Sequence, residues 1–539
     1  MKTSKTTLLH LLRHAYQLAL KANQPHSAPA DELIDQWAEN QSRRRFLRSA
    51  GQLSLMAGGL SLLDACSPAK DIEPEIQRFG DRAARKASDI KVAIVGAGIA
   101  GLNTAHTLQK RSFTNWTIYE ASNRVGGRIY SKTNLLGTGL TTELGGEFID
   151  SSHKDMFYLI KDFNLKLLDM QSPSEQALIK DAYFFNGQHF TLKQVVDAFR
   201  QIAPRMQADI DSLPDSIDFQ TRGIAATLDK ISISDYLTKI GATGWLKELL
   251  EVAYETEYGL VPNVQSCINL LFLISTDTAK GNFDIFGDSD ERYKVVGGNQ
   301  KIIDKLISHY QNRIEIGRTL KAVKKNGSKI ELVFEGGPSV LADFVVLTLP
   351  FTKLRQVDIQ VPLDPVKKKS IQELGYGKNA KLMMGFNTRH WRTLGYTGYV
   401  FSDNTVQSGW DNSQLQPGTA GGYTVYLGGN KGVQVGDGSV QQQVKNYLPK
   451  LNQIFPGVEA QYNGVAERFH WPTHPYTLGS YACYKVGQWT TIGGAESLPV
   501  GSQILFAGEH CSVDYQGYMN GGAETGRQAA NEIIQALLD

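Results

Sequence analysis

The chain has 539 residues, of which 41% are hydrophobic and 20% charged, and its formal net charge is +2. This length can bury a large core and predicts a globular protein of two or more domains. The small net charge, without a basic block interleaved with aromatic residues, argues against nucleic acid as a partner. The four cysteines (Cys66, Cys267, Cys483 and Cys511) form no CxxC pair or cysteine–histidine cluster, so we expect neither a metal site nor a disulfide framework.

The first 69 residues are predicted to be a targeting signal. Residues 42–48, Ser-Arg-Arg-Arg-Phe-Leu-Arg, precede a moderately apolar stretch that is too short and too rich in glycine to span a membrane. They resemble a bacterial twin-arginine export signal, which implies the export machinery as a partner and the bacterial periplasm as the destination. Small residues at 67–69 favour cleavage after Ala69, whereas a lipoprotein-like box ending in Cys66 leaves a membrane tether as the alternative. Residues 70–89 are charged and predict a linker.

A glycine-rich fingerprint opens the body of the chain. The apolar run 91–95 ends in Gly96, Gly98 and Gly101, and a helix-like run continues to Lys110. The first glycine permits a tight turn, the second lets the backbone approach a pyrophosphate, and the third lets helix and strand pack closely. The pattern therefore predicts a dinucleotide site.

Two further features bear on which dinucleotide binds. Glu120 lies roughly 20 residues beyond the last glycine, where a carboxylate can accept hydrogen bonds from a ribose 2′-hydroxyl and would disfavour a 2′-phosphate. A second glycine pair, Gly126 and Gly127, is flanked by Arg124 and Arg128. Such N–H-rich turns and cations suit a cofactor that is held along its whole length.

Beyond the fingerprint, helical and β patterns alternate. Helical patterns dominate residues 153–286, and Ser234 is the expected cap of one helix in this block. Residues 314–350 predict a small sheet that returns to a buried strand, and residues 381–426 a second, mostly β segment. The closing piece, residues 504–527, predicts a strand, a loop and a helix whose N-terminus can face an anion. This interleaving predicts two discontinuous domains.

The motifs GAGIAGL, RVGGR, ELGG, VVGGN, TLP, FAGEH and GYMNGGAETGR occur in this order from about Lys91 to the C-terminus. In this combination the chain resembles the flavin-containing amine oxidases, a family that includes monoamine, polyamine and L-amino acid oxidases. The resemblance implies an α/β fold in which a Rossmann-type FAD-binding domain is interleaved with an α+β substrate-binding domain. The expected FAD-binding pieces are residues 90–152, 289–352 and 471–539, and the expected substrate-binding pieces are 153–288, mainly helical, and 353–470, mainly β.

The resemblance also implies FAD as the cofactor, and all three FAD-binding pieces contribute to the expected contacts. These residues are Gly96, Gly98, Ala100, Gly101, Glu120, Arg128, Gly145, Gly146, Glu147, Val323, Trp471, Gly508, Glu509, Tyr518 and Met519. Ser480 stands where some monoamine oxidases carry a cysteine that is thioether-linked to the flavin. A hydroxyl cannot form that bond, and Cys483 is displaced by three residues, so we expect noncovalent FAD.

Three residues are the expected catalytic groups. Lys381 is the only charged side chain in the apolar run 379–386, and its burial costs several kcal/mol unless the ammonium is hydrogen-bonded or its pKa is depressed. It resembles the family lysine that binds a water at flavin N5, and the alternative is a strand lysine turned to solvent. Tyr481 and Tyr518 resemble the aromatic pair that flanks the substrate amine, with Trp471 and Tyr515 supporting the same wall.

The reaction that the resemblance implies is oxidation of an amine to an imine by hydride transfer to flavin N5. Imine hydrolysis and reduction of O2 to hydrogen peroxide would follow, so the expected partners are a small amine or amino acid and O2. Glu147 stands where L-amino acid oxidases often present an arginine; an acid there would repel a carboxylate and attract a second cation, which favours amines or diamines.

Two alternatives stay open for the reaction. One is an L-amino acid oxidase on the same fold, with Arg292 as the candidate clamp for the substrate carboxylate. The other is a flavin amine dehydrogenase that passes electrons to a partner protein or a quinone. The sequence does not decide the oligomeric state, and a homodimer is one of the options.

Overall fold

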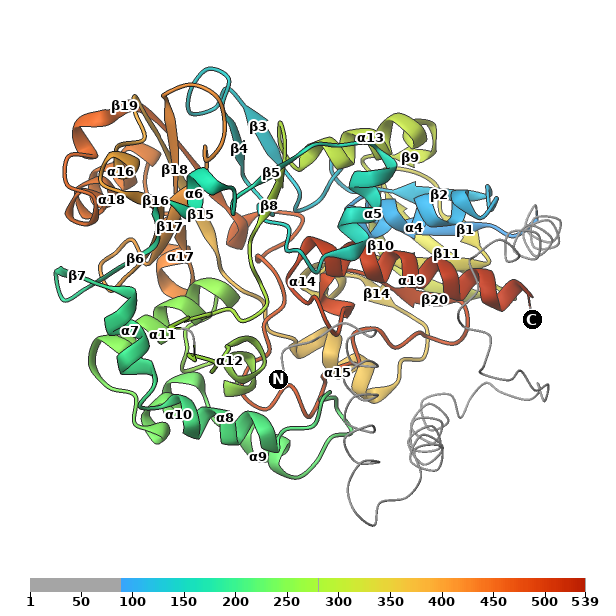
Figure 1. Ribbon diagram of the computed structural model, residues 1–539. Coiled ribbons are helices and arrows are strands. Elements are labelled where there is room, and N and C mark those ends of the chain that lie inside the picture. Colours follow the sequence, from blue (N-terminus) through green and yellow to red (C-terminus); the bar gives the residue numbers. More distant parts are fainter. Residues whose placement is uncertain (1–88, 280, 539) are drawn as a thin grey trace, which may run out of the picture. The chain divides into compact units, whose positions relative to one another are not determined.

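The computed structural model describes residues 89–279 and 281–538 (Figure 1). The expected export signal, the tethering alternative at Cys66, and the expected linker except its last residue lie outside this range. Among the described residues, no helix is long and apolar enough to cross a membrane. The described chain combines helices with parallel and antiparallel sheets, and the predicted α/β fold class is confirmed.

The first sheet has five parallel strands in the order β20-β13-β1-β2-β9. Its central strand β1 (Val92–Val95) consists of four buried apolar residues, as is typical of a parallel strand that is covered on both faces. The other strands come from distant parts of the chain: β2 (Trp116–Tyr119), β9 (Ile314–Glu315), β13 (Phe344–Leu347) and β20 (Ile504–Phe506).

Helices cover one face of this sheet. α4 (Ile99–Lys110) follows β1, and the C-terminal helix α19 (Met519–Leu538) packs against it (Figure 1). A Cβ at Gly526 would lie 2.2 Å from the carbonyl oxygen of Ala100, so this close approach of the two helices requires glycine. The same layer contains α5 (Lys154–Asp162) and α13 (Gln300–Tyr310).

A four-stranded sheet in the order β12-β11-β10-β14 packs on the other face. Val323 and Leu332 of this sheet share a hydrophobic cluster with Ala93 and Val345 of the parallel sheet. The strands of the four-stranded sheet are β10 (Thr319–Asn326), β11 (Lys329–Glu335), β12 (Val340–Ala342) and β14 (Asp358–Ile359).

The third sheet has seven strands in the order β19-β15-β18-β17-β16-β6-β7. Ala380 and Leu382 of β15 belong to a cluster that also contains residues of helix α18 (Val440–Ile454), and the period of two in a strand turns Lys381 to the opposite face. The strands are β6 (Ile179–Phe185), β7 (Gln188–Phe190), β15 (Ala380–Phe386), β16 (Tyr396–Ser402), β17 (Ser408–Asp411), β18 (Gly421–Leu427) and β19 (Tyr462–His470).

A block of helices between Leu192 and Leu273 packs into one hydrophobic cluster. The prediction that Ser234 caps a helix here is wrong: Ser232 is the N-cap of α10, and its Oγ accepts a hydrogen bond from the Asp235 N–H at 3.1 Å. The Ser232 hydroxyl donates in turn to the Asp235 carboxylate, which needs an acid three residues after the cap. The helices are α7 (Leu192–Phe199), α8 (Ala203–Ser212), α9 (Ile224–Leu228), α10 (Ile233–Ile240), α11 (Gly244–Tyr258) and α12 (Cys267–Leu273).

Two short antiparallel pairs place charged residues for the site. β3 (Ser131–Thr133) pairs with β4 (Thr141–Glu143), and β5 (Leu167–Asp169) pairs with β8 (Tyr293–Val295).

The remaining short helices are α6 (Pro173–Gln176), α14 (Phe351–Leu354), α15 (Pro365–Glu373), α16 (His390–Thr393) and α17 (Gly429–Gln434). The parallel sheet draws its strands from the three expected FAD-binding pieces and the seven-stranded sheet from the two substrate-binding pieces, while the domain boundaries themselves stay a prediction.

Candidate active site

One cavity of about 710 Å³ is lined both by the loops of the parallel sheet and by aromatic side chains of the seven-stranded sheet. Residues directly after four parallel strands contribute to it: Gly96 after β1, Glu120 after β2, Thr348 after β13 and Gly508 shortly after β20. Ligands of open α/β sheets bind at this carboxyl edge of the strands. The cavity therefore lies where a dinucleotide is expected.

Each of the three positions in the fingerprint has its own physical reason to be a glycine. Gly96 has φ +105°, and a Cβ there would lie 2.4 Å from Thr348 Oγ1, while a Cβ on Gly101 would lie 2.0 Å from the Gly96 carbonyl oxygen. At these two positions, contacts with other protein atoms leave no room for a side chain, so glycine is required whether or not a ligand is bound. A Cβ on Gly98 would meet only the Gly127 Cα, at 3.9 Å, so its missing side chain leaves room in the cavity.

Glu120 lines the cavity and is held at the end of β2 by the backbone. Its Oε2 accepts a hydrogen bond from the Ala97 N–H at 2.7 Å, and its Oε1 accepts one from the Ser122 N–H at 2.8 Å. The carboxylate thus braces the glycine loop while facing the cavity, as a ribose-binding acid must.

An ion pair joins the first and last parts of the site. Arg128 Nη1 donates to Glu509 Oε1 and to the Ser480 carbonyl oxygen, each at 2.7 Å. Glu509 also accepts the Gly517 N–H at 2.9 Å, just before α19 begins. The guanidinium and the carboxylate thereby fix three loops around the cavity.

Most of the expected FAD contacts line this cavity, and two of them do not. Gly101 packs α4 on β1, and Val323 is fully buried in the cluster between two sheets, whereas Leu320 of the same strand lines the cavity. Near Arg128, a Cβ on Gly145 would lie 1.9 Å from the Arg128 carbonyl oxygen. The glycine loop, the held acid and the ion pair fit a flavin dinucleotide.

Lys381 is 4% exposed and lines the cavity, so the alternative of a lysine turned to solvent is wrong. Its Nζ donates to the carbonyl oxygens of Glu143 at 3.1 Å and Gly145 at 2.9 Å, and to Glu147 Oε2 at 2.8 Å. The hydrogen bonds that its burial requires are therefore present.

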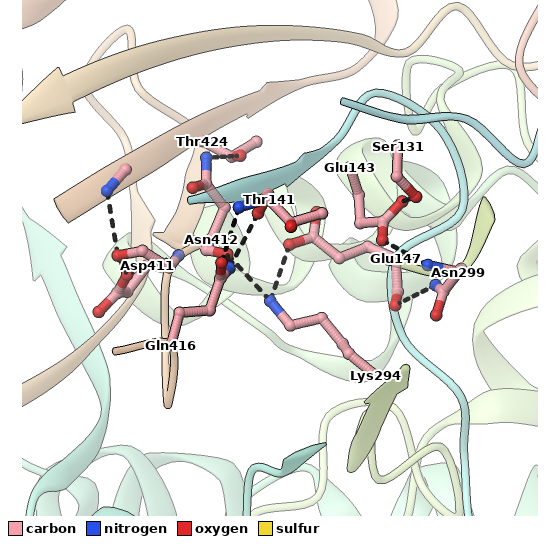
Figure 2. A network of polar contacts seen from close by, with 12 residues as sticks. Ser131, Thr141, Glu143, Glu147, Lys294, Asn299, Asp411, Asn412, Gln416 and Thr424 are labelled. Atoms are coloured by element: carbon pink, nitrogen blue, oxygen red, sulfur yellow. Dashed lines mark hydrogen bonds and ion pairs between the residues drawn. The ribbon is translucent and has the colours of Figure 1, made fainter. Parts of the chain in front are cut away.

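Glu147 is shared between two buried lysines, Lys381 and Lys294, and Figure 2 shows its contact with Lys294. Its Oε1 accepts from Lys294 Nζ at 3.2 Å, and all three side chains are less than 5% exposed. Burial alone would raise the pKa of Glu147, but the two ammonium groups outweigh burial and hold this pKa below its usual value. The interpretation of Glu147 as an acid that attracts a substrate cation is therefore wrong, because its charge is already compensated.

Sequence reasoning missed the partners of Glu147. Lys294 comes from β8, and Asn299 Nδ2 donates to the Glu147 carbonyl oxygen at 2.7 Å (Figure 2). Nearby, burial raises the pKa of Glu143 to about 7, although Ser131 Oγ donates to its carboxyl group at 2.6 Å. The available signal was the position of Lys294 directly before the VVGGN motif.

The two expected substrate tyrosines both line the cavity. Tyr481 lies 2.8 Å from Tyr426, hydroxyl to hydroxyl, and Tyr518 donates to Glu257 Oε1 at 3.0 Å. Burial raises the pKa of both phenols well above 10, so both are neutral in the working pH range. They offer uncharged aromatic faces and oriented hydroxyl groups.

The two expected supporting aromatic residues take different positions. Trp471 lines the cavity, and its Nε1 donates to the Leu144 carbonyl oxygen at 3.1 Å. Tyr515 packs edge-on against His153, which in turn packs edge-on against Tyr518. Tyr515 therefore supports the wall from a second layer.

A dinucleotide-type cavity joined to an aromatic chamber with a buried lysine defines a flavin-dependent oxidoreductase. The chain belongs to the flavin-containing amine oxidoreductases, since the model of that family matches residues 99–534. It is therefore an enzyme of that family, with a flavin as its cofactor.

Known relatives differ in their reactions. An L-amino acid dehydrogenase of Synechocystis sp. is 23% identical over 468 residues, covering 82% of this chain and 94% of the relative. A flavin-containing amine oxidase of Danio rerio is 22% identical over 461 residues, covering 83% and 86%. A solved putrescine oxidase with bound putrescine superposes with a TM-score of 0.71 at 20% identity, covering 83% of this chain and 99% of that one, and this likeness concerns the fold.

Proposed function

We propose that this protein is an FAD-dependent amine oxidase that converts a small amine to an imine. In the full reaction, R–CH2–NH2, O2 and water give R–CHO, NH3 and H2O2, with the imine hydrolysed after oxidation. The supporting observation is that Lys381, Tyr481 and Tyr518 line the same cavity as the glycine loop. Bound FAD supplies the acceptor for the hydride that leaves the α-carbon.

The chain's own residues bind and orient the amine. The phenol rings of Tyr481 and Tyr518 provide apolar surface that admits a neutral amine and limits water around it. Lys381 lines the cavity, and its ammonium group donates to Glu147 and to two carbonyl groups, which fix its position. We assign it to orienting the water or oxygen that takes part in reoxidation.

We also propose that FAD is bound without a covalent link. Ser480, at the position where a linking cysteine would stand, donates its hydroxyl to Asn379 Oδ1 at 2.6 Å. Within the described range, Cys267, Cys483 and Cys511 are buried, and none of them lines the cavity. Release of the yellow chromophore on acid precipitation tests this proposal, and chromophore that stays with the pellet would contradict it.

Two observations favour an amine over an α-amino acid. Arg292, the candidate carboxylate clamp, makes two hydrogen bonds of 2.8 Å to Asp169 and does not line the cavity. The arginines that do line it are bonded elsewhere: Arg128 to Glu509, Arg318 to Glu315, and Arg124 to backbone carbonyl groups. A substrate carboxylate would therefore need to displace an existing partner.

The matched pair of cadaverine and L-lysine tests the proposal, since the two compounds differ only by a carboxylate. We expect cadaverine to bleach the flavin under anaerobic conditions much faster than L-lysine does. The reverse order would support the amino acid alternative. Reduced flavin that persists in air but reoxidises with a quinone would support the dehydrogenase alternative.

We propose, finally, that residues 42–48 direct export to the bacterial periplasm. A double Arg43→Lys, Arg44→Lys change should leave the flavoprotein in the cytoplasm, because the paired arginines carry the signal. Cell fractionation with an activity stain measures this, and unchanged periplasmic activity would contradict it.

A further inference from the structure

Three carboxyl groups line the cavity beside Tyr518: those of Asp150, Glu257 and Glu291. They form one connected arrangement. The Tyr518 hydroxyl lies 3.0 Å from Glu257 Oε1 and 3.3 Å from Ser289 Oγ, and Ser289 donates to Asp150 Oδ2 at 2.7 Å. The acids therefore adjoin the ring that we place beside the substrate amine.

Glu291 differs from the other two acids. Within the described residues, its carboxyl group receives no hydrogen bond and forms no ion pair, and its backbone N–H donates to Asp150 Oδ1 at 3.0 Å. Burial raises the pKa of Glu291 well above its usual range, and the nearby Glu257 and Asp150 raise it further. The residue also has φ +46°, a left-handed conformation that is uncommon outside glycine. A partly exposed, unpaired carboxyl group thus faces the cavity.

Lys381 and the arginines that line the cavity have partners of their own. Lys381 is paired with Glu147, and the lining arginines are bonded to partners near the glycine loop. The positive charge of Lys180 lowers the pKa of Glu291, although Lys180 does not line the cavity. This charge also interacts with three other acids, Asp181, Asp284 and Asp290, so Glu291 is not its only partner. This part of the cavity therefore carries an excess of acidic groups.

Aromatic faces complete the surroundings. Tyr399 stacks on Trp410 with 5.9 Å between ring centroids, and Trp410 lies 5.1 Å from Tyr426. All three line the cavity, and the faces of such rings attract ammonium and guanidinium groups. The acids and the aromatic rings therefore line one cavity, and the fields of Glu291 and Glu257 act on Tyr399.

We infer that this acid-lined part of the cavity binds a second protonated nitrogen of the substrate, with Glu291 as the specificity-determining residue. The substrate class is then an amine that carries a distant ammonium or guanidinium group, such as an α,ω-diamine or agmatine. The inference rests on the proposed amine oxidase function. It replaces the expectation about Glu147, because the paired Glu147 cannot fill this role.

The physical basis is that the two nitrogens of one substrate are in different protonation states and have different partners. The reacting nitrogen must be neutral to release hydride from its α-carbon, whereas the distant nitrogen stays protonated and can meet Glu291. An arriving cation stabilises the ionised form of the Glu291 carboxyl group, whose raised pKa otherwise favours the protonated form. A charge-assisted hydrogen bond of this kind is worth about tenfold or more in binding. A monoamine of equal length would leave the carboxyl group unpaired.

The test compares kcat/KM of the holoenzyme for 1,4-diaminobutane with butylamine, and for 1,5-diaminopentane with pentylamine. We expect the diamine to be favoured by at least about tenfold in each pair, mainly through KM. Glu291→Gln should reduce this ratio by about tenfold, whereas Glu248→Gln, at an exposed site on α11, should not change it. The wild-type comparison does not depend on whether a variant folds.

Several outcomes separate the inference from the proposed function. Oxidation of monoamines as efficiently as diamines would overturn the inference and leave the amine oxidase proposal in place. An unchanged diamine preference in a folded, yellow Glu291→Gln protein would overturn the role of Glu291. If no amine in either series bleaches the flavin, the inference fails together with the proposed function.

Discussion

Arg128 and Glu509 are separated by 381 positions in the sequence, yet their side chains form an ion pair with 2.7 Å between Nη1 and Oε1. The pair joins the loop after the fingerprint to the loop after the last parallel strand. Because Glu509 also accepts the N–H of Gly517, one carboxylate fixes the approach to α19. The cavity thus depends on contacts between the two ends of the described chain.

Loss of the Glu509 carboxylate should weaken flavin binding. In Glu509→Ala, the Arg128 guanidinium loses its charged partner and two loops lose a common anchor. We expect about 2 kcal/mol of lost stability and a clear loss of bound flavin. Flavin content and thermal unfolding measure both effects. Glu315→Ala, which removes a more exposed acid from Arg318, serves as the control and should keep its flavin.

Glu147→Gln should destabilise the protein because it leaves two buried ammonium groups without their shared carboxylate. Breaking a buried pair on one side costs about 3–5 kcal/mol. The double variant Glu147→Gln, Lys294→Met removes one of the stranded charges, so it should recover part of that loss. Urea unfolding of the four proteins of this cycle gives the coupling energy. Additive effects would contradict the shared ion pair.

Lys381→Met should slow reoxidation of the reduced flavin far more than it changes flavin affinity. The reason is that Lys381 lines the cavity from β15, whereas the glycine loop and Glu120, which we expect to hold the dinucleotide, belong to the parallel sheet. Stopped-flow mixing of the reduced protein with O2 measures the reoxidation rate, and flavin content measures the affinity. Equal losses in both would indicate a purely structural lysine.

Lys367 gives the protein a pH-dependent stability. Burial lowers the pKa of its ammonium group to about 7, from 10.5 in an unfolded chain. Between these values the unfolded chain binds a proton that the folded protein does not, so this lysine destabilises the fold less as the pH rises from 7 towards 10.5. The slope is at most about 1.4 kcal/mol per pH unit.

The variant Lys367→Met should therefore stabilise the protein more at pH 6 than at pH 9. Thermal unfolding of both proteins across this range measures the difference. Lys368→Met, an exposed neighbour, is the matched control and should give a flat difference. A flat difference for Lys367→Met as well would contradict the shifted pKa.

Local patterns in the sequence predicted a large part of this site. The glycine spacing placed the loop after β1, and the lone charge in an apolar strand placed Lys381 in a buried position that must supply hydrogen bonds. Both features depend on residues close together in the chain. The helix cap was predicted two residues too late, because Ser232 and Ser234 are equally plausible caps until the acid three residues further on is considered.

The residues that surround the buried acids, and so determine whether their charges are compensated, could not be predicted in the same way. Lys294 lies 147 positions after Glu147, and a pairing over that distance leaves no local signal. The same holds for Glu291, whose position beside Glu257 and Tyr518 follows from the meeting of a helix end, a loop and the start of α19. The expectation about a cationic substrate was therefore attached to Glu147, which two lysines already pair.

The most direct test of the central claim is an anaerobic titration of the purified protein with 1,4-diaminobutane, followed through the visible flavin absorbance. The proposed oxidase function predicts a yellow protein whose absorbance is bleached by the amine and restored by air, with one hydrogen peroxide formed per amine oxidised. A yellow, folded protein whose absorbance no amine changes would contradict it.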